Sequence, residues 1–396
     1  MDHCAYQEQL RAILKTRESG FPDTEFRQRW QALDRKLAES GLDALLITQP
    51  ADIHYLTGYN TFEVSVHTAL AYCPGRLVLQ VPSIETGPAI ATALCDDVMG
   101  YRWESSDEIV EPLARTLRSM GHRIGYDGWS AGLRCGVLDA LRDRLSGAVL
   151  QETGGLLASL RRVKSPAEID CLVRSARMTE AGIDAAGRAA VSGATDSQVA
   201  AAATEGLHNA GSEFMSMQPI IVAGQRSSII HTNHHRYPLV PGESVFLELG
   251  GVCERYTAPL MHTVMVDNTR PDDKRRRVAR YCREVYQTLI DAMRPGETFD
   301  HAARQAEGAL APLADEAFFS GVFGYTVGAT FPPSWVEGSG FIARNQFTAF
   351  EENMVFHLPL CFRLPGDWGI GFSETVRVSA AGGAPLTRND WSFADI

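Results

Sequence analysis

The chain has 396 residues, enough for two domains, because a single hydrophobic core rarely grows beyond about 250 to 300 residues. A content of 45% hydrophobic and 21% charged residues is that of a globular protein and excludes a disordered or fibrous chain. The formal net charge of −11 argues against a nucleic-acid partner, since binding to phosphates needs clustered Lys and Arg.

Cysteine usage and hydrophobicity bear on cellular location. The eight cysteines are scattered singly, without a C-x-x-C pair, which is typical of reduced thiols in a cytoplasmic protein. The first residues carry charges throughout and lack the apolar core of a secretory signal. No segment approaches the ~20 apolar residues of a membrane span. The sequence therefore predicts a cytoplasmic protein without a membrane partner.

The first part of the chain alternates helix and strand patterns. Apolar residues spaced three or four apart predict a helix over 24–40, with Thr24 as its cap and Gly41 at its end. Further helices are expected at 106–120 and 130–145, and strands at 43–50, 76–81, 123–128 and 148–151. Such alternation is typical of an α/β domain. The connection at 53–68 is dense in Tyr, Phe and His, which indicates either a packed edge or a small-ligand pocket or subunit contact.

The pattern changes at LRRVKSPAEID (160–170). Pro166 breaks the preceding segment, and Ser165 with Glu168 three residues later forms a capping box that opens a long helix. We therefore expect a domain boundary near residue 163, with domains at 1–163 and 164–396. Long helical patterns interleaved with strand hairpins predict an α+β second domain, with helices at 167–190, 272–293 and 298–313.

One acidic residue lies inside an apolar strand pattern. Glu248 interrupts the run from Val245 to Leu249, which Gly250-Gly251 ends. A buried, unpaired carboxylate is costly, so either this strand has a solvated face or Glu248 has a function. The stretch taken alone favours the solvated strand.

Five segments of the second domain carry a family resemblance: IIHTNHH (229–235), VFLELGGVCERYTAPLMHT (245–263), FGYTVGATFPPSWVEG (323–338), MVFHLPLCF (354–362) and DWGIGFSETVRV (367–378). In order and spacing they resemble the metallopeptidase M24 superfamily, as does the boundary motif RRVKSPAEI. The resemblance covers essentially the whole chain. It implies a smaller α/β creatinase-type N-terminal domain followed by an α+β C-terminal pita-bread domain.

Metal-dependent members of this superfamily hold two cations with two Asp, one His and two Glu. The matching positions here are Glu248, Pro259, Tyr325, Pro359 and Glu374. Proline has no side-chain donor, so a dinuclear metal site is not expected, and the resemblance implies no other cofactor.

The metal-free branch fits better. FLELGG, YTAP, GYTVG, FPPSW, FHL and DWGIGFSE resemble the corresponding segments of ectoine hydrolases, whereas creatinases carry a carboxylate near the position of Met261. The N-terminal loop departs from that pattern, because ectoine hydrolases have a Trp near Phe62. The resemblance implies a hydrolase acting on a C–N bond of a small amidine, guanidine or cyclic amide, with ectoine or a close analogue as the best substrate.

The resemblance also implies roles for single residues. Glu248 is the expected nucleophile, Glu374 the second carboxylate and His231 the acid and base, since imidazole suits proton transfer near neutral pH. A surface or capping role is the structural alternative for His231, and packing for the aromatic residues. The expected substrate-binding residues are Tyr59, Phe62, Tyr256, Tyr325, Trp335, His357 and Trp368. The resemblance further implies a homodimer in which the aromatic loop, with Phe62, completes the partner's pocket.

Two other functions remain as alternatives. An Xaa-Pro dipeptidase-like enzyme is disfavoured by Pro259, Tyr325 and Pro359. A catalytically inactive pita-bread module used for binding is disfavoured because drift would not be expected to leave Glu248, Glu374 and His231 together.

Overall fold

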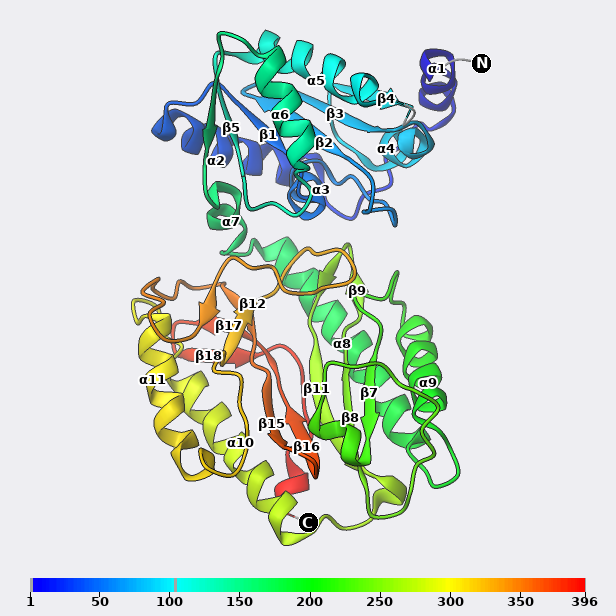
Figure 1. The fold of residues 1–396 in the computed structure, drawn as a ribbon, viewed down its shortest axis with the longest axis vertical. Coiled ribbons are helices and arrows are strands. Elements are labelled where there is room, and N and C mark those ends of the chain that lie inside the picture. Colours follow the sequence, from blue (N-terminus) through cyan, green and yellow to red (C-terminus); the bar gives the residue numbers. More distant parts are fainter. Residues whose placement is uncertain (1–2, 103–104, 396) are drawn as a thin grey trace. The chain divides into compact units, whose positions relative to one another are not determined.

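The computed structural model describes residues 3–102 and 105–395, and its ribbon is drawn in Figure 1. The chain forms two compact units, Met1–Arg161 and Arg162–Ile396. Each unit has hydrophobic cores of its own. Sequence reasoning placed the boundary near residue 163.

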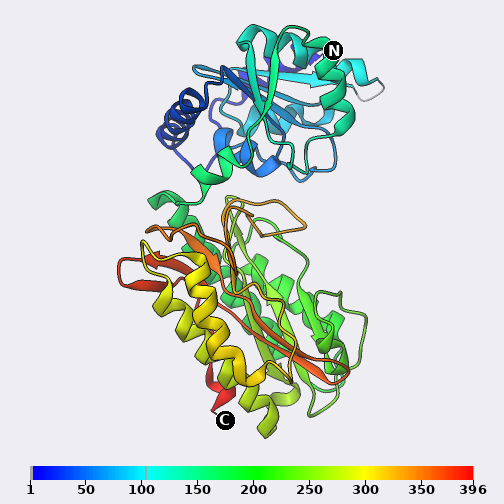
Figure 2. The ribbon, with the colours of Figure 1, turned by 60° about the vertical axis from the view of Figure 1, so that its left-hand side comes forward.

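The N-terminal unit is a six-stranded sheet with helices on both faces (Figures 1 and 2). The strand order is β4-β3-β2-β1-β5-β6, and β1 is antiparallel to β2 but parallel to β5. The strands are β1 Ala44–Ile47, β2 Ala69–Cys73, β3 Arg76–Pro82, β4 Asp97–Tyr101, β5 Arg123–Tyr126 and β6 Val149–Glu152. The helices are α1 His3–Ile13, α2 Asp23–Ser40, α3 Pro50–Thr57, α4 Thr86–Thr92, α5 Ser106–Met120, α6 Cys135–Arg144 and α7 Leu156–Arg161. The expected α/β architecture is confirmed.

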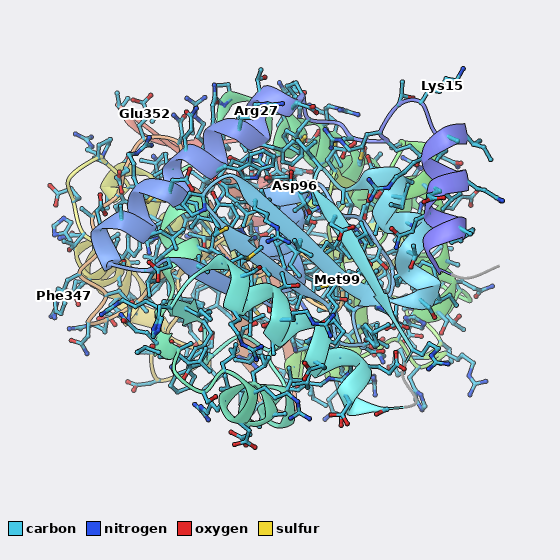
Figure 3. All side chains as sticks on the ribbon, turned by 90° about the horizontal axis from the view of Figure 1, so that it is seen from above. Lys15, Arg27, Asp96, Met99, Phe347 and Glu352 are labelled. Atoms are coloured by element: carbon cyan, nitrogen blue, oxygen red, sulfur yellow. The ribbon has the colours of Figure 1, made fainter. Side chains whose placement is uncertain are left out.

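Two local predictions in this unit are corrected. Helix α2 begins at Asp23 after Pro22, so Thr24 lies inside the helix and does not cap it. Part of the aromatic connection is helical, because Pro50 fits the first turn of α3 and Gly58 ends the helix with φ 76°. Charged side chains such as Lys15 and Arg27 extend outward from this unit (Figure 3).

The C-terminal unit begins with two helices packed on a three-stranded sheet. The sheet order is β11-β8-β7, formed by β7 Ile220–Ala223, β8 Ser244–Leu249 and β11 Leu260–Met265. Helices α8 Pro166–Ala189 and α9 Asp196–Asn209 contact this sheet, and a short hairpin of β9 Val252–Cys253 and β10 Tyr256–Thr257 follows β8. The predicted capping box of Ser165 and Glu168 is present at the start of α8.

The second half of this unit packs helices α10 Asp273–Ala292 and α11 Phe299–Leu310 on further strands. Five strands follow the order β13-β12-β14-β17-β18. They are β12 Gly324–Thr326, β13 Phe341–Ile342, β14 Val355–His357, β17 Thr375–Ser379 and β18 Gly382–Pro385. Strands β15 Leu360–Leu364 and β16 Trp368–Phe372 form a hairpin. In Figure 1 the strands of this unit lie between α9 on one side and α10 and α11 on the other.

The two halves of the C-terminal unit meet where β16 approaches β8. A Cβ on Gly371 would stand 2.2 Å from the Phe246 ring, so only glycine permits this approach. The Thr263 hydroxyl donates to the Gly371 carbonyl and accepts from its N–H, both at 3.0 Å. This junction brings β8 of the first half close to the strands of the second half.

Two further findings concern the cysteines and the helices. All seven cysteines whose side chains the structure describes are free thiols. Within residues 3–102 and 105–395, no helix has the length and apolar character needed to cross a membrane.

Candidate active site

The C-terminal unit contains a cavity of about 450 Å³, a size that suits a small ligand. Four of the predicted site residues line it: His231, Glu248, Tyr325 and Trp335. The remaining lining residues come from the same unit and are Met217, Ile230, Met261, Ser320, Pro333, Ser334, Val336, Pro359, Cys361 and Arg363.

Glu248 lies in the central strand of the three-stranded sheet. Met261 of β11 and Ile220 of β7 stand opposite it on either side. The residue is only 2% exposed, so the expectation of a solvated strand face is wrong. Its Oε2 atom is buried without a hydrogen-bond partner among the described residues. Burial raises the pKa of this carboxyl to about 8, because removal from water disfavours the charged form.

A chain of hydrogen bonds runs along one side of this cavity. Tyr325 of β12 stands opposite His357 of β14, and its phenol oxygen lies 2.9 Å from Nδ1 of that histidine. Trp335 donates its indole N–H to the same phenol oxygen at 2.8 Å. The other ring nitrogen of His357 lies 2.7 Å from the Ser373 hydroxyl, which accepts the Met261 N–H at 2.5 Å.

The network assigns a direction to these hydrogen bonds. Burial lowers the pKa of His357 to about 3, so its ring is neutral and carries one proton. Among the described residues, Nε2 of His357 is the one acceptor within reach of the buried Ser373 hydroxyl proton, so we assign this proton to the hydrogen bond with Nε2. The ring proton then lies on Nδ1 and is donated to Tyr325. The phenol proton of Tyr325 is therefore left for a group inside the cavity.

Tyr325 remains protonated in this setting. Burial, and then the negative charge of Glu248, raise the pKa of the phenol well above its usual range. Both groups line the same cavity. The cavity thus combines an acidic carboxyl with a neutral proton donor.

His231 reaches the cavity from the segment that follows a short 3-10 helix, Gly224–Ser228. It is exposed, and it adopts a left-handed backbone with φ 48°, directly after Ile230 with φ 51°. Two consecutive non-glycine residues in this region are unfavourable, and such backbone strain often occurs at functional sites.

Glu374 does not line the cavity, which differs from its expected role as a second carboxylate. Its oxygens accept hydrogen bonds from the Thr387 hydroxyl at 2.5 Å, the Asn389 N–H at 2.8 Å and the Trp391 indole at 3.3 Å. Burial raises its pKa to about 7, although these hydrogen bonds act in the opposite direction. The carboxyl of Glu374 is therefore occupied in holding the C-terminal segment.

Two predicted aromatic residues also lie elsewhere in the C-terminal unit. Trp368 belongs to the core under α10, and the guanidinium of Arg275 stacks on it at 4.8 Å. Tyr256 is buried and donates its hydroxyl to Glu168 at 2.8 Å, at the start of α8. Neither side chain is among the cavity-lining residues, because each is used by a helix end or a helix surface.

Tyr59 and Phe62 belong to the N-terminal unit. Tyr59 is buried and donates its hydroxyl to Glu85 at 3.1 Å, so it packs within that unit. Phe62 is 83% exposed and lies on the surface of that unit.

Sequence reasoning missed Ser373 and Arg363. The residues that flank Ser373 in the sequence do not indicate its role. That role, a hydrogen bond to His357 and one from Met261, arises only from the tertiary packing between β16 and β17. Arg363 carried a signal, since it is a charged residue inside the apolar strand pattern LCFRL, as Glu248 is in its own strand.

The side chains at the family's metal positions do not fit a two-metal centre. Pro259 offers only its carbonyl, which accepts the Thr375 hydroxyl at 2.8 Å, and the carboxyl of Glu374 is occupied as described. Across residues 3–102 and 105–395, no three His, Cys, Asp or Glu side chains are grouped closely enough to hold a metal ion.

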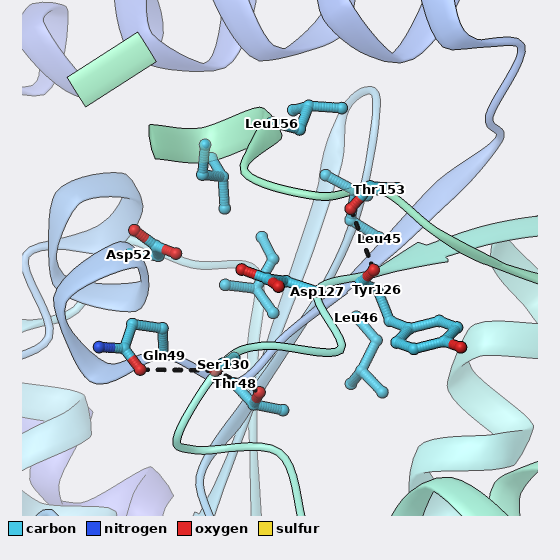
Figure 4. Close-up of a pocket in the computed structure, with 12 residues that line it drawn as sticks. Leu45, Leu46, Thr48, Gln49, Asp52, Tyr126, Asp127, Ser130, Thr153 and Leu156 are labelled. Carbon is cyan, nitrogen blue, oxygen red and sulfur yellow. Dashed lines mark hydrogen bonds between the residues drawn. The ribbon is translucent and has the colours of Figure 1, made fainter. Parts of the chain in front are cut away.

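A second hollow lies in the N-terminal unit, between β1, β5 and α7 (Figure 4). Its accessible volume is about 20 Å³, which is room for about one water molecule. Asp52 at its edge pairs with Arg161 at 2.7 Å. This hollow is too small for a substrate.

Comparisons with known proteins agree with this architecture. Residues 170–380 match metallopeptidase family M24, and residues 29–163 match the creatinase/prolidase N-terminal domain. The ectoine hydrolase of Halomonas elongata is 24% identical over 91% of this chain and 95% of its own. An Xaa-Pro dipeptidase of Pyrococcus furiosus is 21% identical over 92% of this chain and 99% of its own.

A solved structure shows the same fold. The X-Pro aminopeptidase of Thermotoga maritima superimposes with a TM-score of 0.80 at 18% identity, over 91% of this chain and 98% of that chain. The fold agrees with the M24 match. Membership of this family, together with the hydrolase relatives, identifies the chain as a hydrolase. The chain belongs to metallopeptidase family M24, in the form that carries a creatinase/prolidase N-terminal domain.

Proposed function

We propose that this protein hydrolyses a C–N bond of a small amidine, guanidine or cyclic amide without a metal ion, using Glu248 as the nucleophile. The observation that carries the proposal is the buried carboxyl of Glu248, which faces a ligand-sized cavity with one oxygen unpaired. A cationic substrate such as an amidinium would pair with this group and favour its ionised form. Ectoine, a cyclic amidine, is the best single substrate.

In the first step, an oxygen of Glu248 bonds to the amidine carbon, and the C=N electron pair moves onto nitrogen. The second C–N bond then breaks as the lone pair of the attached nitrogen re-forms the C=N bond. The departing nitrogen keeps the electron pair of the broken bond and takes a proton from His231. Tyr325 donates its phenol proton in a hydrogen bond to the nitrogen that remains attached.

In the second step, water attacks the carboxyl carbon of Glu248 and gives one proton to His231. The bond between that carbon and the bridging oxygen breaks, so the oxygen stays on the substrate carbon as an amide carbonyl and the carboxylate is restored, while the second water proton passes to the released amine. Both steps use only groups that line the cavity. Trp335 and His357 act through Tyr325, whose phenol they orient.

The dipeptidase alternative is less well supported. Xaa-Pro dipeptidases are also among the relatives, but the side chains at the metal positions here offer no ligand set for their two cations.

Because the site lacks such a ligand set, we expect the activity to be unaffected by a chelator. An assay of ectoine, hydroxyectoine, creatine and Ala-Pro, with and without EDTA, tests this together with elemental analysis. Turnover of Ala-Pro alone, lost with EDTA and accompanied by about two metal ions per chain, would contradict the proposal.

We also propose a cytoplasmic homodimer whose pocket is completed by the partner's aromatic loop. Phe62 supports this, because its large apolar side chain is 83% exposed. The variant Phe62→Ser should raise the KM of the substrate at least about tenfold, whereas Trp129→Ser, at another exposed aromatic residue of the same unit, should change it little. A fully active monomer in size-exclusion chromatography would contradict this proposal.

A further inference from the structure

Arg363 is the one strongly basic side chain that lines the cavity, and its guanidinium has no hydrogen-bonding role in the described part of the chain. It lies on β15, where Leu360, Phe362 and Leu364 point into the hydrophobic core. Because side chains alternate along a strand, Cys361 and Arg363 share the opposite face, and both line the cavity.

The surroundings hold this side chain without neutralising it. Backbone hydrogen bonds between Arg363 and Phe318, at 2.8 and 3.1 Å, fix the strand beneath it. The guanidinium stacks on the Phe318 ring at 4.5 Å, and its Nε atom is buried without a partner. No carboxylate within the described residues forms an ion pair with it. A partly buried arginine fork that is oriented but unpaired is suited to a carboxylate brought by a ligand.

Glu248 and Arg363 therefore give the cavity two opposite charges on different strands. Within the described residues no ion pair joins them, and Oε2 of Glu248 and Nε of Arg363 are both buried without a partner. We infer that Arg363 binds a carboxylate of the substrate, and that the substrate is a small zwitterion with a cationic reacting group and a separate carboxylate. This inference rests on the proposed function, because it takes Glu248 as the group that faces the reacting carbon.

This assignment makes Arg363 a specificity-determining residue. The amidine group would lie at Glu248 and Tyr325, and the carboxylate would be held at β15. Compounds that contain the cation alone would then bind weakly. Arg363→Lys keeps the charge but loses the planar fork, so it should recover only part of the affinity.

The test compares each acid with a counterpart that lacks the carboxylate, by isothermal titration calorimetry. One pair is ectoine and the same methylated ring without its carboxylate; the other is Ala-Pro and Ala-Pro amide. The proteins are the unmodified chain, Arg363→Gln, and the matched control Arg377→Gln. Arg377 is also a half-buried strand arginine with an unpaired Nε, but it lies outside the cavity.

We expect Arg363→Gln to lose about 30-fold in affinity for ectoine, within the range of a charge-assisted hydrogen-bond pair. Affinity for the ring without a carboxylate should change less than about threefold, and Arg377→Gln should bind like the unmodified chain. Equal losses for both members of a pair, or no loss, would overturn the inference.

The two pairs separate this inference from the proposed function. If only the dipeptide pair binds and Arg363→Gln weakens the acid selectively, the proposed substrate class fails and the carboxylate site stands. If ectoine binds no better than the ring lacking its carboxylate, the carboxylate site fails while the proposed reaction stands. Binding of neither pair overturns both.

Discussion

Glu248→Gln is expected to lower kcat/KM at least about a thousandfold while the protein remains folded. The amide is nearly isosteric and fits the same strand position, but it cannot attack an amidine carbon. Each factor of ten corresponds to about 1.4 kcal/mol of transition-state stabilisation, so the loss amounts to about 4 kcal/mol. Steady-state kinetics with ectoine, alongside thermal melting, measures both effects.

The matched control is Glu374→Gln. This residue is also a buried carboxyl with a raised pKa, but it holds Thr387, Asn389 and Trp391 rather than lining the cavity. It should lower the melting temperature and leave kcat within about tenfold. Equal losses of kcat in the two variants would mean that both carboxyls take part in the chemistry.

The same Glu248 variant should alter the pH dependence of stability. Burial raises the folded pKa of Glu248 from 4.5 to about 8, so the protonated form is favoured in the fold. Its contribution is therefore fully present below pH 4.5 and is lost as the pH rises toward 8. Glu248→Gln should gain stability relative to the unmodified chain across this window, by up to about 1.4 kcal/mol per pH unit. Denaturant unfolding at pH 5 and pH 8.5 measures the difference, and no change between the two pH values would contradict the burial of an acid here.

Tyr325→Phe is expected to lower kcat about a hundredfold with a smaller effect on KM. The substitution keeps the ring but removes the only phenol that lines the cavity in the described chain, and with it the proton donated to the substrate nitrogen. The indole of Trp335 and the ring of His357 also lose their shared partner, which should lower the free energy of unfolding by about 1 to 3 kcal/mol.

Tyr256→Phe is the control for this loss. Its phenol is buried and donates to Glu168, but it lies away from the cavity. It should lower stability in a similar way and leave kcat within about threefold. If Tyr325→Phe lowers stability to the same extent but leaves kcat unchanged, the phenol has only a structural role.

The alternation of helix and strand patterns was sufficient to predict the architecture. Helix α5 begins and ends at its predicted residues, and the capping box at Ser165 opens α8 as expected, because both are local signals. Thr24 does not cap α2, because the helix begins directly after Pro22. The neighbouring residues alone did not distinguish a helix start at Asp23 from one after Thr24.

The site was harder to predict because its residues meet only through tertiary packing. Glu248 stood out as an acid in an apolar strand, and the family resemblance led to Tyr325, Trp335 and His231, which line the cavity with it. The same resemblance carried over Glu374 and Trp368, whose side chains are directed to the C-terminal segment and to α10. Side-chain direction at those two positions depends on neighbours more than 10 residues away, such as Asn389 and Arg275, so motif spacing alone could not reveal it.

A single turnover in water enriched in 18O tests the central claim most directly. If Glu248 is the nucleophile, the first product carries oxygen from the carboxyl, and the carboxyl regains its oxygen from labelled water. Tandem mass spectrometry of the tryptic peptide 237–255 then finds 18O on Glu248 and not on Glu243 or Glu254. Labelled product with an unlabelled Glu248 would show that water attacks the substrate directly and would contradict this account.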